Sequence, residues 1–171
     1  MMIRALALLA LILANGPVAS RAQDAGLIAT IREEANEIDR NLPAYDRQSK
    51  VVLGVSTEGA SVDYYRDGEK LRKIAAKIYG ERFNSDAEFY FNGDDLLFVH
   101  EEFNRYDTQI GMDPPAQVVS SEEKWLYFSA AELVALRIGE KDLSRSDAQW
   151  QETGSWIAEL VRKLRAASQD E

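Results

Sequence analysis

The chain carries a single histidine and no cysteine, which limits the chemistry that its side chains can perform. Without cysteine there is no thiol nucleophile and no thiolate metal ligand. The histidine stands in His100-Glu101-Glu102, which lacks the second histidine, one helical turn away, of a zinc-protease motif. A Ser-His-Asp triad would depend on His100 as its base. The alternation of residue types instead places His100 on the polar face of a strand with Phe98 and Glu102, so we expect a surface histidine beside a charged neighbour.

Carboxylates are numerous, since the chain has 29 Asp and Glu residues. Residues 92–95 and 101–102 offer oxygen ligands, but the Asp-x-Asp-x-Asp-Gly order of a calcium loop is missing and Gly93 fits a tight hairpin turn. Carboxylate pairs about 5–10 Å apart across a cleft would suit glycoside hydrolysis, yet so many acids form such pairs by chance. There is no glycine-rich phosphate loop, GxSxG elbow or SxxK motif. We therefore expect no catalytic residue, no metal site and no cofactor.

Aromatic residues recur at one position in each of three similar segments, and they are the strongest remaining signal. Aligned on Leu71, Leu96 and Leu133, the segments have a tyrosine six residues earlier, namely Tyr65, Tyr90 and Tyr127. Such residues either pack across neighbouring strands or form an exposed platform for a partner protein or a glycan. The platform interpretation makes these three tyrosines partner-binding candidates, together with Tyr106 and Met112 from the turn-rich insert 105–123.

The three segments read as β-hairpins over 59–79, 86–104 and 122–138. Gly68 and Gly93 stand at matching turn positions, where a positive φ is often required, and Ala130 replaces them in the third copy. The return strands alternate, with Ile74, Ala76 and Ile78, for example, on one face and charged residues on the other. One dry face and one wet face are expected of an antiparallel sheet that is covered on one side.

Two helices flank the hairpins. Over 24–42 an amphipathic pattern follows Asp24 as a cap and stops before Pro43. Over 146–167 a second pattern begins with Ser146 and Gln149, which fit a capping box. The sequence therefore predicts the α+β class, with an antiparallel meander sheet of about six strands packed against N- and C-terminal helices, and both helices are expected to close over the dry face.

The N-terminus has the layout of a secretory signal peptide over residues 1–22. One basic residue precedes the apolar run 5–14, which is too short for the roughly 20 residues of a membrane span. Small residues allow cleavage after Ser20 or after Ala22, and Ala22 is preferred, which leaves residues 23–171 as a single domain in the periplasm or outside the cell. The net charge of −9 makes nucleic acid a poor partner, and it suits either solubility or a basic partner.

The hairpin sequences also resemble a group of small exported bacterial proteins of unknown function. The resemblance runs through STEGASVDYYRDGEKLRKIAAKIYGE and EFYFNGDDLLFVHEEFNRYD and covers roughly residues 27–165. Proteins of this group pair a Tyr-Tyr…Gly-x-x-Leu hairpin with a Tyr-Phe-x-x-Gly…Leu-Phe-Val hairpin between flanking helices. The resemblance implies the fold, and it carries no assigned activity.

These observations favour a non-enzymatic binding or interaction module of the cell envelope, whose partner is a protein or a glycan. The first alternative is a carboxylate-based hydrolase of envelope polymers, which requires a cleft with two convergent acids and a raised pKa on at least one of them. The second is a proteinaceous inhibitor of a secreted enzyme, which requires a protruding, ordered loop, expected within 105–123.

Overall fold

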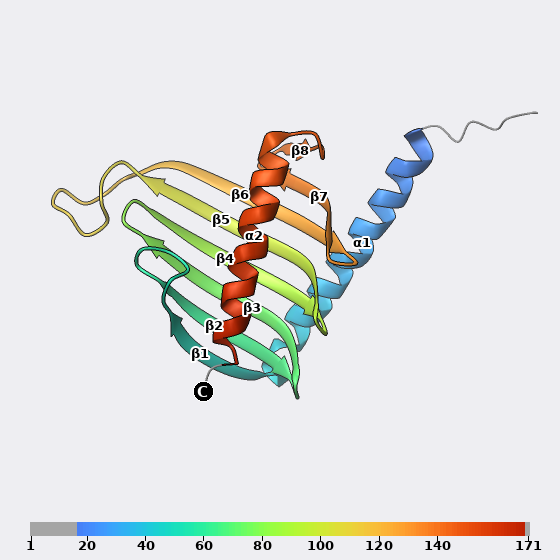
Figure 1. Cartoon of the computed structure of the whole chain (residues 1–171), viewed down its shortest axis with the longest axis horizontal. Coiled ribbons are helices and arrows are strands. Elements are labelled where there is room, and N and C mark those ends of the chain that lie inside the picture. The colour runs from blue at the N-terminus through green and yellow to red at the C-terminus, as the bar shows by residue number, and fades with distance from the viewer. Residues whose placement is uncertain (1–16, 170–171) are drawn as a thin grey trace, which may run out of the picture.

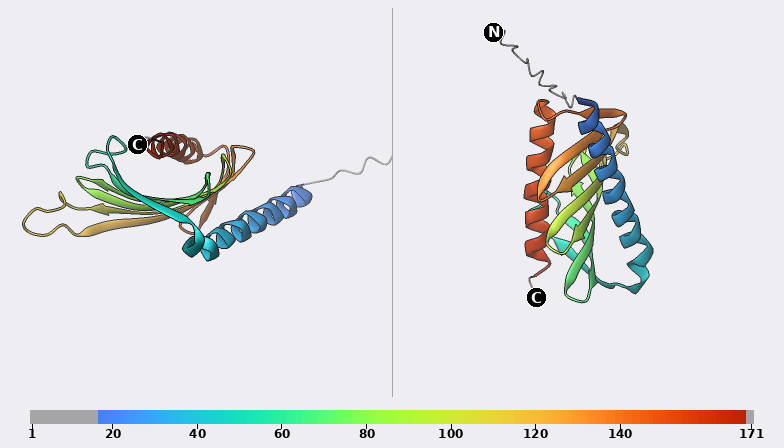
Figure 2. Two further views of the ribbon diagram at one scale, coloured as in Figure 1. Left: turned by 90° about the horizontal axis from the view of Figure 1, so that it is seen from below. Right: turned by 90° about the vertical axis from the view of Figure 1, so that its right-hand side faces the viewer.

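The computed structural model describes residues 17–169, which form an antiparallel β-sheet with a helix on either side (Figures 1 and 2). In chain order the elements are α1 (Pro17–Asn41), the 3-10 turn η1 (Leu42–Ala44), β1 (Asp46–Val52), β2 (Ala60–Asp67), β3 (Lys70–Gly80), β4 (Phe83–Asn92), β5 (Asp95–Tyr106), β6 (Val118–Ser129), β7 (Glu132–Ile138), β8 (Lys141–Leu143) and α2 (Ala148–Ala167). Each strand pairs with its sequence neighbour, so the sheet is a meander of eight strands. The α+β class, the antiparallel sheet and the two terminal helices are confirmed.

The prediction of about six strands is wrong, because β1 and β8 add an edge strand on each side of the three predicted hairpins. The sequence of β1, DRQSKVV, is mostly polar and exposed and lacks a clear apolar alternation. The strand β8 has only three residues. Short or polar edge strands are common because they discourage pairing with other chains, and the same properties hide them from pattern analysis.

The three predicted hairpins are β2–β3, β4–β5 and β6–β7, and each has the same irregularity at the same place. The pairing register shifts directly after Tyr65, Tyr90 and Tyr127, so one extra residue bulges from each return strand. Each hairpin closes through a two-residue loop whose first residue has a positive φ, at Gly68 (59°), Gly93 (62°) and Ala130 (50°). The sequence alignment of the hairpins therefore corresponds to equivalent backbone positions.

The main core lies between the sheet and α2, which crosses the concave side of the curved sheet (Figure 2). Strand residues that face α2 form a cross-strand row, Ile74, Phe89, Val99, Leu126 and Leu136, and all of them are buried. The α2 side chains that meet them recur at helical spacing: Trp150, Ile157, Leu160, Val161 and Leu164. The dry face predicted from the return strands is confirmed.

The two helices do not close over one face as expected, because α1 lies on the opposite side of the sheet from α2 (Figure 2). Its buried residues Ala35 and Ile38 pack on Tyr90 and Phe98, which point away from α2. The reason lies in the register, since the repeated tyrosines share one row that also holds Lys73 and Phe98. This aromatic row gives the second face an apolar strip, which the alternating pattern of the return strands alone does not reveal.

The helix boundaries differ from prediction at both N-terminal ends. The helix α1 continues through Asp24 back to Pro17, a residue that a first helical turn tolerates. The helix α2 begins at Ala148 with Asp147 as its N-cap, and the Asp147 carboxylate accepts the backbone N–H of Ser144 at 2.7 Å, so the predicted Ser146 capping box is wrong.

Residues 1–16 of the predicted signal peptide lie outside the described residues, and export stays a prediction. Across residues 17–169, no helix combines the length and apolarity that a bilayer span requires.

Candidate functional site: a polar groove on the outer face

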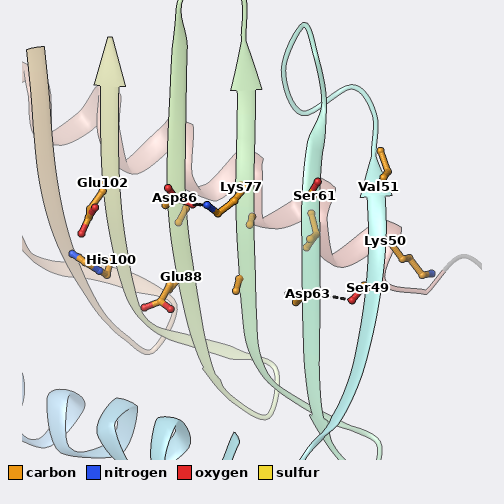
Figure 3. A pocket seen from close by; sticks show the side chains of 14 residues that line it. Ser49, Lys50, Val51, Ser61, Asp63, Lys77, Asp86, Glu88, His100 and Glu102 are labelled. Carbon is orange, nitrogen blue, oxygen red and sulfur yellow. Dashed lines mark hydrogen bonds and ion pairs between the residues drawn. The ribbon is translucent and has the colours of Figure 1, made fainter. Parts of the chain in front are cut away.

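The face of the sheet turned away from α2, here called the outer face, is partly covered by α1 and otherwise carries polar side chains. A groove of about 670 Å³ runs over β1 to β5 on this face (Figure 3). We call it the polar groove and define it by the outer-face side chains that line it: Ser49, Val51, Ser61, Asp63, Ala75, Lys77, Asp86, Glu88, His100 and Glu102. The polar groove lies beside the aromatic row, so α1 borders it at one end of the strands.

Strand register alone assembles the polar groove from five separate segments. Two neighbouring cross-strand rows supply it: Ser49, Asp63, Ala75, Glu88 and His100 in one, and Val51, Ser61, Lys77, Asp86 and Glu102 in the other. The lining of β1 to β3 is mostly small, apart from Asp63 on β2 and Lys77 on β3, whereas β4 and β5 carry the other three carboxylates. The acids are therefore concentrated at the β5 end of the groove, with Asp63 separate near the β1 end.

At the β1 end, Asp63 is held in its ionised form. Arg47 contacts its carboxylate at 2.6 Å and the Ser49 hydroxyl donates to it at 2.5 Å. The hydrogen bond from Arg47 lowers the pKa of Asp63 from its usual range against a smaller opposing effect of burial. Asp63 thus stays ionised at neutral pH as the partner of Arg47.

Near α1, Glu88 belongs to a charged cluster that fastens the helix to the sheet. The ammonium of Lys73 lies 2.7 Å from Glu88 and 2.7 Å from Asp39 of α1, and it donates to the Tyr90 hydroxyl at 3.0 Å. Lys73 is almost fully buried, with 5% of its side chain exposed. Burial raises the pKa of Glu88, but the hydrogen bond and charge of Lys73, together with the Tyr90 hydroxyl, outweigh burial and lower it overall. We call these four residues the α1 anchor.

The same surroundings act in the opposite direction on the tyrosine of the α1 anchor. Burial raises the pKa of Tyr90, and the neighbouring carboxylates of Glu88 and Asp39 raise it further. The phenol therefore stays protonated and remains a hydrogen-bond donor, at 2.9 Å from Glu88 and 3.0 Å from Asp39.

At the β5 end, His100 lies on the polar face as predicted and contacts a charged neighbour. Its Nε2 lies 2.8 Å from Oε1 of Glu123 on β6, and its ring stacks on Trp125 with centroids 5.7 Å apart. Glu102 stands directly opposite Glu123, and one ligand atom from each of these two acids and from His100 falls within 4.8 Å of the others. Three such side chains could share a cation, and this adds to the acidic character of the β5 end.

The five predicted partner-binding residues lie in three different environments. Tyr90 and Tyr127 are buried beside α1, where Phe98 packs against both rings at centroid distances of 5.5 and 5.0 Å. Tyr65 is half-buried in the same row, and Arg47 lies over its ring. Tyr106 and Met112 lie at the other end of the sheet, where the Tyr106 hydroxyl accepts from Asn84 and Met112 is 55% exposed. For Tyr90 and Tyr127 the structure therefore shows packing against neighbouring side chains, which was the alternative to an exposed platform.

The sequence pattern does not mark Asp63, Lys73 or Glu88 as functional candidates. Alternation does place Lys73 on the wet face, but its burial comes from α1, which is far away in the sequence. The acidic concentration likewise depends on pairing between β4 and β5 that brings Asp86 opposite Glu102. The sequence does show charged residues alternating along each strand. It does not show the pairing register of the strands, which brings these residues together.

Fold and groove together define an α+β protein in which one face of a meander sheet carries the core and the other carries a solvent-open, acidic groove. Comparisons with protein-family models, with curated proteins and with solved structures found no match to this chain.

Proposed function

We propose that the protein is an exported, non-enzymatic binding module of the cell envelope, and that its polar groove takes a positively charged, extended segment of a partner protein. The observation that carries this proposal is the excess of carboxylates in the groove. Four acids line it, namely Asp63, Asp86, Glu88 and Glu102. Three of them have a basic partner, since Arg47 contacts Asp63, Lys77 contacts Asp86 and Lys73 contacts Glu88. Glu102 stands opposite a further acid, Glu123, so the excess negative charge is greatest at the β5 end.

The dimensions of the groove suit an extended segment of about six residues. Five strands about 4.8 Å apart span about 19 Å, and an extended chain advances about 3.3 Å per residue. Asp63 on β2 and Glu88 on β4 share one cross-strand row and lie two strands apart, about 10 Å. A segment in the polyproline II conformation has three residues per turn and advances about 3.1 Å per residue, so every third side chain points the same way at intervals of about 9 Å. A basic residue at every third position of such a segment would match the spacing of these acids.

Export and acidity support the same proposal. The apolar run 5–14 supports delivery to the envelope, and the chain charge of −9 favours basic over acidic partners. The lowered pKa of Asp63 and Glu88 keeps these acids charged, which suits cation binding better than the general-acid role that the hydrolase alternative requires.

The test is a titration with the acetylated, amidated peptide Lys-Ala-Ala-Lys-Ala-Ala-Lys, followed by calorimetry and by NMR shifts of β2 to β5. We expect binding in low salt that weakens steeply at 0.5 M salt, because screening shortens the reach of exposed charges. Neutralising Asp63 and Glu102 together (D63N/E102Q) should weaken binding about tenfold, as two partly exposed ion pairs together contribute about 1.4 kcal/mol.

The matched control neutralises two exposed acids outside the groove, E69Q/E140Q, and changes the net charge by the same amount. If the control weakens peptide binding as much as D63N/E102Q does, the attraction belongs to the net charge and the groove is not the site. A peptide with Glu in place of Lys should not bind.

A second candidate function, inhibition of a secreted enzyme, is favoured by the loop 107–117 between β5 and β6, which projects beyond the sheet (Figure 1). Its base is fastened, since the Ile110 N–H donates to the Glu81 carbonyl at 2.8 Å and the Gln117 N–H to Asp107 at 2.8 Å. Ile110 and Met112 are exposed on it. Replacing residues 108–116 by a short turn should abolish inhibition of a susceptible secreted hydrolase and leave peptide binding in the groove unchanged.

A further inference from the structure

A second and larger cavity, about 1040 Å³, lies at the β7–β8 edge of the sheet against the N-terminal half of α1. We call it the edge cavity. Its apolar walls come from α1, from the edge strands and from the start of α2: Ala25, Ile28, Ala29, Val134, Ala135, Leu136, Leu143 and Trp150. The cavity belongs to neither the polar groove nor the α1 anchor, so what it binds is a question separate from the proposed function.

The edge cavity exists because β8 is short and α1 is long. The strand β8 pairs with Leu136–Ile138, so the stretch 132–135 of β7 has no strand beside it on that side within the described residues. The helix α1 passes this edge and contacts β7, and the half-buried Ile28 remains part of the cavity wall. Apolar side chains of α1 and of β7 thus line the same space.

Three arginines and two acids, Glu33 and Asp142, border the edge cavity, so its charged lining has an excess of one positive charge in a chain with a net charge of −9. Arg32 of α1 is fixed, since its Nε donates to the Tyr127 hydroxyl at 2.6 Å and its guanidinium lies over the Tyr127 ring. Arg137 lies 3.4 Å from Asp142, and Arg145 is exposed on the connection between β8 and α2. Guanidinium groups bind carboxylate and phosphate well because their N–H groups form a planar fork.

We infer that the edge cavity binds an amphipathic anion with one apolar chain, namely a long-chain fatty acid, with its carboxylate at Arg32 and Arg145 and its chain along Ile28 and Val134. Ligand sites of this kind are mostly apolar clefts of about 300–1,000 Å³ with a few placed polar groups. The positive charges of the arginines favour an anionic headgroup, and the apolar walls favour a hydrocarbon chain.

The test is a titration of the full chain with decanoate, laurate and myristate below their micelle concentrations, read by calorimetry and by the tryptophan fluorescence, to which Trp150 in the cavity wall contributes beside Trp125 and Trp156. Each added methylene should strengthen binding about fourfold, the value for burying one methylene. Tetradecanol, which keeps the chain and lacks the charge, should bind at least about tenfold more weakly than myristate, as expected for loss of one charged hydrogen bond.

Two variants locate the site. R145Q changes an exposed side chain, so it should fold normally, weaken myristate binding and leave tetradecanol binding unchanged. A29W places a large ring in the cavity and should abolish binding of both ligands, whereas its control T30W, on the next exposed position of α1, should not.

Three results would overturn the inference: equal binding of myristate by A29W and by the native chain, no gain in affinity with chain length, or equal affinity for myristate and tetradecanol. Anionic phosphatidylglycerol vesicles distinguish a membrane headgroup from a free acid. Vesicle binding that survives A29W would assign the attraction to the surface charge of the bilayer and likewise overturn the cavity. The groove variant D63N/E102Q should bind myristate normally, so failure of the proposed function leaves this inference standing.

Discussion

The two faces of the sheet are made by the same strands, yet they attach their helices in different ways. On the concave face, α2 is held by large apolar side chains, and Ile157, Leu160 and Leu164 are at most 1% exposed. On the outer face, α1 is held by a narrow strip around Ile38 and by the buried ammonium of Lys73. Burial of apolar area is the larger stabilising term, so α2 is expected to contribute most of the stability.

The difference shows how one sheet can separate stability from recognition. Residues that alternate along a strand point to opposite faces, so Val99 completes the core while its neighbour His100 reaches the polar groove. A helix fastened by charged groups covers less of its face than one fastened by a broad apolar stripe. The uncovered part of the outer face remains free for the polar groove.

The largest expected effect comes from shortening an α2 core residue. L160A should destabilise the protein by about 3–4 kcal/mol, because a buried leucine loses its transfer energy and leaves a cavity. Urea unfolding followed by circular dichroism measures the loss. I38A on α1 is the comparison: hydrogen exchange should show it opening α1 locally while the amides facing α2 keep their protection. Global unfolding of I38A in one step with the sheet would contradict the separation of the faces.

Removing the centre of the α1 anchor tests the charged attachment directly. K73A should cost about 3 kcal/mol, at the lower end for a broken buried ion pair because Asp39 and Glu88 keep about 40% exposure. The control is K77A on the same strand, whose exposed contact with Asp86 should be worth less than about 1 kcal/mol. Equal losses from both variants, measured by denaturant unfolding, would mean that burial of Lys73 contributes nothing special.

Acid should weaken the α1 attachment through Glu88. The folded-state pKa of Glu88 is lowered from its usual 4.5, so the unfolded state binds the proton more readily. The stability that Glu88 contributes is therefore complete above pH 4.5 and is lost as pH falls from there through the lower folded-state pKa. The stability difference between the native chain and E88Q, measured from pH 7 to pH 3, should shrink in that window. A difference that stays constant would remove Lys73 as the partner of an ionised Glu88.

Local sequence pattern predicts those parts of the fold that depend on neighbouring residues. The alternation around Ile74 and Val99 was enough to place the dry face, and Pro43 was enough to end the first helix near Asn41. The side of the sheet that α1 occupies was not predictable, because it depends on which face the repeated tyrosines take, and a one-residue change of register reverses that choice.

The candidate site was less predictable than the fold, for the same physical reason. The acids of the polar groove are spread over three strands, and only the cross-strand pairing of Asp86 with Glu102 and Glu88 with His100 brings them together. The edge cavity was even less predictable from the sequence, since it results from the shortness of β8 and the placement of α1. Pattern identifies the polar residues, and register decides which of them share a site.

The smallest expected effect concerns the hairpin turns, which belong to neither face. In the third turn Ala130 and Ala131 have φ of 50° and 64°, a conformation that costs a residue with a Cβ about 1–2 kcal/mol. A130G should therefore stabilise the protein by about 0.5–1 kcal/mol after the greater flexibility of glycine in the unfolded chain is subtracted. G68A at the matching position of the first turn should destabilise it by about 1 kcal/mol, although a Cβ there meets no atom within 4 Å. Both changes should shift global unfolding and leave α1 protection and peptide binding unaltered. A turn variant that instead released α1 would show that the two faces are coupled through the turns, and the comparison of independent faces would fail.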